Sequence, residues 1–200
     1  PGFVHDVCSA VHPLAVASPF FRTLPLAEHG LEWICPPAAL AHPLDDGTAV
    51  LVRNSVQETA AGLDADAEAY ASLMEGLRRR WPLIEEAVLG PLTWPRHPAA
   101  AARFGLQALR PATGFARARF QTERARAVFA GIAAHGMAPL ERLLTAGFGL
   151  VLGVLAHLGG WPAPRGGAQK IADALAGCLR AHGGTIVTGT RVRSLEDLPQ

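Results

Sequence analysis

Residues 159–189, GGWPAPRGGAQKIADALAGCLRAHGGTIVTG, carry the strongest fold signal in this sequence. Two adjacent glycines, Gly166 and Gly167, stand directly before a helix that we predict over residues 168–182. Gly183 is expected to end this helix in the left-handed conformation that glycine adopts easily. The apolar residues expected on its buried face have helical spacing and are Ile171, Leu175, Cys178 and Leu179.

The segments that follow this helix favour extended chain. They are TIVTG at 185–189 and TRVRSL at 190–195. A helix, a glycine pair and a strand make up the second half of a βαβ crossover, as in Rossmann-like domains. Adjacent glycines also let the backbone approach another helix or a ligand closely. Arg165 beside these glycines, at the start of a helix, could hold an anion. A purely structural turn is the alternative, and it explains the same residues equally well.

Composition limits the classes of function. The chain has 200 residues, of which 50% are hydrophobic, so it can bury a core in one large domain or two small ones. Its net charge of +1 argues against nucleic acid as the main partner. The basic run at 78–80 shares its helix with acidic residues, which is typical of a solvated face. Three distant cysteines without a CxxC pair argue against zinc and dithiol sites and favour a cytoplasmic protein with reduced thiols.

The rest of the chain predicts an α+β fold that is mainly helical, with a small antiparallel sheet. Strand candidates cover 31–35, 39–44 and 48–53, and Asp45–Gly47 is a hairpin signal between the last two. A short helix is expected to end at 61, with Asn54 or Ser55 as its cap, and further helices are expected from Asp64 to 90, near 99–109, and at 122–136 with Thr122 as the cap. Pro82 is expected to kink or break the second of these helices.

The segment 143–161, LLTAGFGLVLGVLAHLGGW, is nearly long enough to cross a bilayer. Gly149 and Gly153 form a GxxxG pattern, which also occurs in membrane helices. The glycines lower helix propensity, however, His157 lies inside the segment, and prolines follow it at once. We therefore expect a helix buried in a protein core, with glycines that permit close packing or line a cavity. A membrane-attached protein is the alternative.

Other candidate sites have simpler explanations. His5, Asp6 and His12 do not have a standard metal-ligand spacing, so we predict no metal site. Ser9 beside His12 lacks the GxSxG elbow of hydrolases. His157 is typical of a core or cavity histidine whose hydrogen bonds are satisfied. The sequence also has no GxGxxG fingerprint, which a self-contained dinucleotide site would need.

Four stretches together resemble one family across nearly the whole chain. They are PGFVHDVCSAVHPLAVASPFF, GLEWICPPAALAHPLDDGTAVLVRNS, GWPAPRGGAQKIADAL and GGTIVTGTRVRSL. The chain is similar to the phytoene dehydrogenase-like FAD-dependent oxidoreductases, which include carotenoid desaturases and the pyridine nucleotide-disulfide oxidoreductase domain-containing protein 2 relatives. The third stretch, followed by the TGxxV strand, is the most specific part of this resemblance.

The resemblance implies an internal segment of a longer enzyme that dehydrogenates an apolar substrate by hydride transfer to flavin. It implies an edge of the FAD domain at 1–17, a substrate-binding domain at 18–160 and a return to the FAD domain at 161–200. The full-length enzyme would bind FAD, whereas this segment alone would bind it weakly or not at all. The residues implied to lie at the cofactor are Arg165, Gly166, Gly167 and Val192.

We place the substrate pocket along the helix at 143–158, with Leu150, Val154, His157 and Trp161 as its residues. Trp161, between glycines and prolines, is also a candidate structural anchor. No residue matches a family catalytic acid or base, because flavin supplies the redox chemistry in such enzymes. Peripheral membrane contact and a homo-oligomer are both compatible with this reading. The alternative to an enzyme is a helical interaction module that docks on a partner chain.

Overall fold

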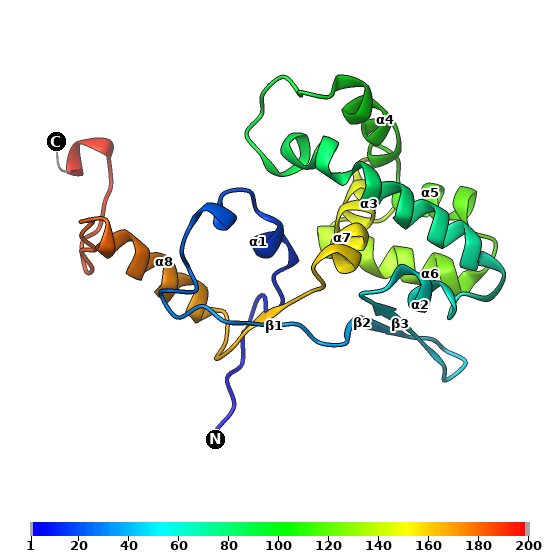
Figure 1. The fold of residues 1–200 in the computed structure, drawn as a ribbon, viewed down its shortest axis with the longest axis horizontal. Helices are drawn as coiled ribbons and strands as arrows, with labels where there is room; N and C mark the ends of the chain where they lie inside the picture. The colour runs from blue at the N-terminus through cyan, green and yellow to red at the C-terminus, as the bar shows by residue number, and fades with distance from the viewer. Residues whose placement is uncertain (1, 199–200) are drawn as a thin grey trace.

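A computed structural model describes residues 2–198 and has an α+β fold made mainly of helices (Figure 1). Two short antiparallel strand pairs accompany the helices, β1 with β4 and β2 with β3. The elements in chain order are α1 (Pro13–Ala17), β1 (Trp33–Ile34), β2 (Ala38–Pro43), β3 (Ala49–Arg53), α2 (Val56–Ala60), α3 (Ala67–Leu89), α4 (Pro98–Ala108), α5 (Ala112–Arg119), α6 (Glu123–Ala133), α7 (Thr145–Leu158), β4 (Ala163–Pro164) and α8 (Gln169–Ala181).

The β2–β3 hairpin confirms the turn predicted at Asp45–Gly47. Asp46 accepts hydrogen bonds from the main-chain N–H of Thr48 at 2.8 Å and from its hydroxyl at 2.7 Å. Gly47 has φ of +81°, which glycine adopts without a steric penalty. Val50 and Val52 on β3 point into the core with 1% and 0% of their surface exposed. The hairpin therefore covers one side of the helical body.

Helix α7 lies in the centre of this body and packs against α3, α4, α5 and α6 (Figure 1). Ten of its 14 residues are buried, which confirms the prediction of a core helix. A Cβ added to Gly149 would lie 2.7 Å from the Phe129 ring, and one added to Gly153 would lie 3.0 Å from Met74. Gly149 and Gly153 thus allow α7 to pack closely against α6 and α3. Within residues 2–198, no helix is both long enough and apolar enough to cross a membrane.

Helix α3 corrects the expectation that Pro82 breaks it, because the helix continues through Pro82 to Leu89. Proline removes one main-chain donor, so the carbonyl of Arg78 loses its partner in the helix. Pro82 lies on the exposed side, where water can reach that carbonyl. Trp81 and Ile84 on either side of it are buried in the core, and their packing holds the helix together.

Other predicted caps agree with the structure to different degrees. The hydroxyl of Ser55 accepts a hydrogen bond from the N–H of Glu58 at the start of α2. Thr122 caps α6 in the same way, and the apolar residues Ala125, Val128, Phe129 and Ile132, which have helical spacing, are buried on one face of that helix. Asp64, in contrast, begins a 3₁₀ turn, and α3 starts only after Asp66.

Helix α8 belongs to a second, smaller core. Ala174 and Cys178 of this helix pack with Leu26 and Leu31, and the partly buried Ile171 and Leu175 flank them. Leu179 was expected on the buried face, but 48% of it is exposed. The packed positions 171, 174, 175 and 178 define a face that is rotated away from Leu179. Gly183 ends the helix at φ of +83°, as predicted.

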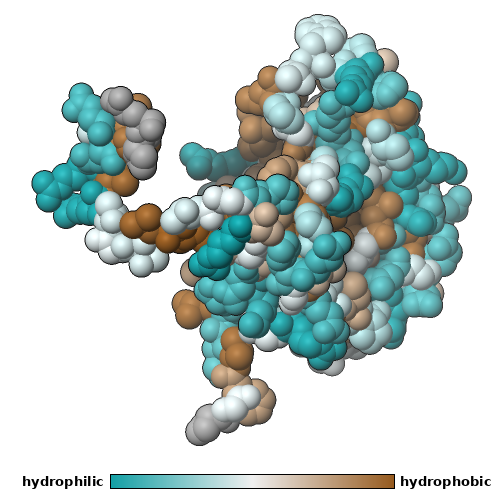
Figure 2. Space-filling model, turned by 60° about the vertical axis from the view of Figure 1, so that its left-hand side comes forward, coloured by the Kyte–Doolittle hydropathy of each residue, from teal (hydrophilic) through white to brown (hydrophobic). Residues whose placement is uncertain are grey.

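The segments at 185–189 and 190–195 make no strand pairs with any residue in the described part of the chain. A strand needs a neighbouring strand for its hydrogen bonds, and β1 pairs instead with β4. This C-terminal part stands away from the main body (Figure 2). The Rossmann-like piece therefore stays a prediction.

The three expected domain ranges cut across the two cores. Helix α1, in the range 1–17, packs on α7 of the helical body. Residues 21–33, from the range 18–160, share the smaller core with α8 of the range 161–200. Residues 1, 199 and 200 lie outside the described part of the chain.

Candidate functional site

A cavity of about 660 Å³, which we call the apolar cavity, lies between α3, α4 and α7. Among residues 2–198, no Asp, Glu, Lys or Arg side chain lines it, and His135 is the one titratable group in its lining. Volumes of this size are typical of small-molecule sites. Its lining residues are Leu14, Ile84, Ala87, Val88, Leu89, Ala101, Phe104, Gly105, His135, Leu144, Gly147, Phe148, Val151 and Leu152.

The sequence positions of these residues explain the cavity. The C-terminal end of α3 forms one wall, and α4 forms another. Helix α7 lines the cavity with its first two turns, where Gly147 lacks a side chain and lies against Ala108 of α4. Phe148 and Leu144 remain about half exposed at the edge of the cavity. The arrangement favours an uncharged apolar ligand, because a buried charge would find no partner there.

His135 is held in a fixed position at this cavity. It lies in the 3₁₀ turn that follows α6, and its Nδ1 is 3.1 Å from the carbonyl oxygen of Gly131 and 3.2 Å from that of Ile132. The Trp161 ring meets the His135 ring edge-on, with ring centres 4.8 Å apart. Trp161 is itself anchored by a hydrogen bond from its Nε1 to the carbonyl of Leu152.

The four residues expected to form the substrate pocket lie elsewhere. Leu150 and Val154 are fully buried, and His157 and Trp161 are only 5% and 3% exposed. None of the four lines the apolar cavity. Spacing along an apolar helix could not distinguish its core-facing side from its cavity-facing side, because both carry hydrophobic residues.

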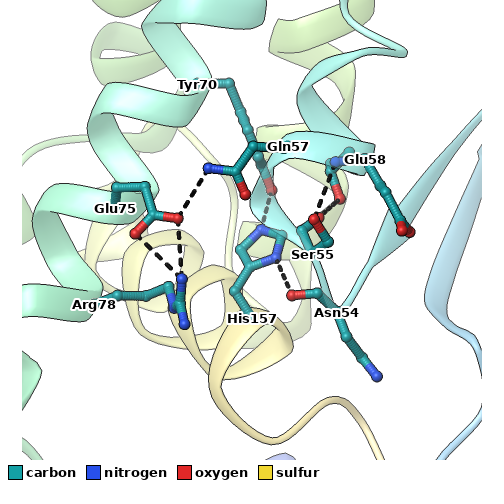
Figure 3. Close-up of polar contacts among 9 residues, drawn as sticks. Asn54, Ser55, Gln57, Glu58, Tyr70, Glu75, Arg78 and His157 are labelled. Atoms are coloured by element: carbon teal, nitrogen blue, oxygen red, sulfur yellow. Dashed lines mark hydrogen bonds and ion pairs between the residues drawn. The ribbon is translucent and has the colours of Figure 1, made fainter.

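His157 is a core histidine with both ring nitrogens hydrogen-bonded (Figure 3). Its Nδ1 lies 3.2 Å from the carbonyl of Asn54 and must donate, so Nε2 accepts from the Tyr70 hydroxyl at 2.7 Å. Burial lowers the pKa of His157, although the hydrogen bond to Asn54 opposes this shift. Burial also raises the pKa of Tyr70. Both groups are therefore neutral near pH 7, as a structural pair requires.

Arg165, Gly166 and Gly167 lie together in a turn before α8, which we call the glycine turn. Gly166 and Gly167 have φ of +88° and +94°. Arg165 forms an ion pair of 2.8 Å with Glu32, and its N–H donates to the carbonyl of Glu32. Val192, the fourth residue expected at the cofactor, is half exposed beyond the far end of α8. The whole of α8, which is about 20 Å long, lies between the two places along the chain.

The close approach that the glycines permit is made by the N-terminal segment. A Cβ added to Gly167 would lie 2.6 Å from Val4 and 3.3 Å from Asp6. The carboxylate of Asp6 accepts a hydrogen bond from the N–H of Ala168, at 2.9 Å and 3.0 Å from its two oxygens. An anion of the chain itself thus occupies the helix start, and Arg165 is already paired. The glycine turn, in this arrangement, does not fit a phosphate group.

The other polar residues near the N-terminus have structural roles. Ser9 donates to the carbonyl of Val11, and the main-chain N–H of His12 donates to Pro162. The His12 ring lies against Trp33. Across residues 2–198, no three His, Cys, Asp or Glu side chains lie close enough together to hold a metal ion.

Sequence reasoning missed His135 and the α4 wall. The histidine falls at the end of the predicted helix at 122–136, which gave no sign of a pocket, and α4 is rich in alanine.

Comparisons of the chain with family models, with curated proteins and with solved structures found no match.

Proposed function

We propose that this chain binds an uncharged apolar molecule in the apolar cavity, as the substrate-binding part of an FAD-dependent oxidoreductase. The observation that carries the proposal is a cavity of about 660 Å³, which no Asp, Glu, Lys or Arg of the described residues lines. The reaction class, removal of hydrogen from the substrate with flavin as acceptor, rests on the resemblance to phytoene dehydrogenase-like enzymes. In that class the cofactor supplies the redox chemistry and the protein positions the substrate and excludes water.

The role of this chain's own residues is confined to the apolar ligand. The hydrophobic walls of α3, α4 and α7 would bind and orient it, and they would keep water from its reacting part. The pairing of Asp6 with the start of α8 argues that FAD phosphates are bound by other parts of the full-length protein. We accordingly propose that FAD belongs to the full-length protein and is not retained by this segment.

The first experiment tests ligand binding in the cavity. Ala101 on α4 lines the cavity, whereas its neighbour Ala102 is exposed and does not. Ala101→Trp should fill the cavity and weaken binding of the apolar probe 2-methoxynaphthalene at least tenfold, as measured by equilibrium dialysis. Ala102→Trp adds the same side chain on the same helix and should bind the probe like the parent. Equal binding by both variants would place the ligand elsewhere.

The second experiment tests the reaction class. The full-length protein, purified without added cofactor, should show the two-band visible spectrum of flavin, released on denaturation. A colourless, folded protein that also fails to take up added FAD would remove the oxidoreductase proposal. The ligand-binding proposal would survive that result if Ala101→Trp still abolished probe binding. The alternative, a non-enzymatic module, would then become the better account.

One surface feature favours an additional contact with membranes, compatible with a peripheral cytoplasmic protein. The loop 90–97 joins the α3 and α4 walls of the cavity, and on it Leu92 is fully exposed and Trp94 is 86% exposed. Exposed Leu and Trp side chains bind readily at the interface of a bilayer. Co-sedimentation with phosphatidylcholine and phosphatidylserine vesicles should fall when Leu92 and Trp94 are both changed to Ser. Unchanged sedimentation would dismiss this contact.

A further inference from the structure

We propose that the ligand of the apolar cavity carries one hydroxyl or N–H group, which donates a hydrogen bond to Nε2 of His135. This inference rests on the proposed ligand-binding function and specifies the class of ligand. It starts from the fact that, in the part of the chain that the structure describes, His135 is the only titratable residue lining the cavity.

The hydrogen bonds of His135 determine what it offers. Carbonyl oxygens only accept hydrogen bonds, so Nδ1, which faces the carbonyls of Gly131 and Ile132, carries the proton in the neutral ring. The second nitrogen, Nε2, then has a lone pair and acts as an acceptor. Among residues 2–198, no side chain or main-chain group makes a hydrogen bond with Nε2.

The surroundings of the ring hold this acceptor in place. Trp161 packs edge-on against His135, at an interplanar angle of 86°, and is itself buried and hydrogen-bonded to Leu152. Two carbonyls fix the opposite edge of the ring. A rigid acceptor in an otherwise apolar wall is a polar group of the kind that gives small-molecule sites their orientation and specificity.

The chemistry of the lining disfavours charged ligands and gives a ligand with a hydrogen-bond donor an advantage over a hydrocarbon. A carboxylate or phosphate would bring a charge that no Lys or Arg in the cavity could pair, and a cation would find no Asp or Glu. A pure hydrocarbon would fit the walls but would make no use of Nε2, which would then be left to water because His135 is an exposed residue at the edge of the cavity. An apolar alcohol, phenol or amide N–H compound satisfies both the walls and the histidine.

The test compares two probes that differ only in the hydrogen-bond donor, 2-naphthol and 2-methoxynaphthalene. A neutral hydrogen bond in a protein strengthens binding by about three- to tenfold. We expect the unmodified chain to bind 2-naphthol tighter by that factor. In His135→Phe the ratio should fall to about one, while the affinity for 2-methoxynaphthalene is retained. His135→Gln, which restores an acceptor, should recover part of the preference.

Three results would overturn the proposal. Equal affinities for the two probes in the unmodified chain would show that no acceptor is used. A preference retained in His135→Phe would assign the acceptor to another residue. Failure to bind either probe would remove the ligand-binding function as well, which distinguishes that failure from the first two. Near-ultraviolet circular dichroism of each variant, which reports on the Trp161 environment, checks that the fold is intact.

Discussion

Gly167 and Gly183 lie at opposite ends of α8, and glycine is needed at each for a different reason. Both have left-handed φ, at +94° and +83°. A Cβ at Gly183 would meet nothing within 4 Å, whereas one at Gly167 would meet Val4 and Asp6. Gly183 therefore needs glycine for its backbone angle alone. Gly167 needs it also for the contact that joins the N-terminal segment to the helix.

Alanine at these two positions should therefore have different costs. Gly183→Ala should cost about 1–2 kcal/mol, the penalty for an L-residue in the left-handed region. Gly167→Ala should cost about 1–3 kcal/mol more, because the methyl group also overpacks the contact with Val4. Hydrogen exchange of the amides in α8 measures the loss of stability in each variant. Equal protection in the two variants would show that the contact with Val4 carries no energy.

His157 should make stability depend on pH. Burial lowers its pKa below the ordinary value of 6.5. As the pH falls below 6.5, the unfolded chain binds a proton that the folded chain takes up only at a lower pH, so the free energy of unfolding falls. His42, whose pKa is lowered by burial and by the charge of His135, adds to the same trend.

We expect urea unfolding to show lower stability at pH 5 than at pH 7.5. The drop should be smaller in His157→Gln, which cannot be protonated, than in the unmodified chain. Glu75 and Asp46, whose pKa values lie below their ordinary values of 4.5 and 3.8, do not titrate in this range. A pH dependence of the same size in both proteins would show that protonation of His157 is not coupled to unfolding.

At the scale of the element, α3 shows how packing can outweigh a local breaker. Pro82 removes a main-chain hydrogen bond, yet the helix runs for 23 residues because its other side is buried in the main core. Asp66 fixes the position of its first turn. The buried Asp66 carboxylate accepts bonds from the main-chain N–H groups of Gln121 and Thr122 and from the Thr122 hydroxyl.

Pro82→Ala should stabilise the protein by up to about 3 kcal/mol, because it restores the donor to the Arg78 carbonyl and relieves the ring's clash with the preceding turn. Equilibrium urea unfolding measures this gain. Arg79→Ala, an exposed change one turn earlier in the same helix, should shift stability by less than about 0.5 kcal/mol. A loss of stability in Pro82→Ala would mean that the proline is needed for the geometry of the helix.

At the scale of the whole molecule, the two hydrophobic cores differ greatly in size. Helices α3, α6 and α7 share the large core, whereas the smaller core that α8 joins has four buried residues within 2–198, Leu26, Leu31, Ala174 and Cys178. Regions with few buried apolar contacts open at a lower free energy than the rest of a protein. We therefore expect α8 to open without unfolding of the helical body.

Thiol labelling can measure this opening. Cys8 and Cys35 are exposed and should react with a maleimide at once, whereas Cys178 is 6% exposed and should react only when α8 opens. Leu31→Ala should accelerate labelling of Cys178, because truncation of a buried Leu costs about 2–5 kcal/mol. Global urea unfolding, followed by far-ultraviolet circular dichroism, should stay unchanged. A matching loss of global stability would show that the two cores unfold as one.

Local patterns in the sequence were enough for much of the secondary structure. The Asp-Gly turn of the hairpin, the cap at Thr122 and the buried face of α6 depend on residues a few positions apart, so their sequence alone predicts them. The same holds for Gly183, whose conformation is a property of one residue. The cap of α2 was narrowed to Asn54 or Ser55, and the structure shows Ser55. The helix break expected at Pro82 was wrong because the packing that opposes it comes from distant helices.

The sequence by itself therefore determined an α+β chain with a buried α7 and a glycine turn before α8. Only the tertiary structure decided what these features face. It buried His157 against Tyr70, left His135 at the apolar cavity and placed Val4 and Asp6 on the glycine turn. The physical reason is that helical periodicity identifies an apolar face but not its neighbour. That neighbour is set by contacts between segments far apart in the chain.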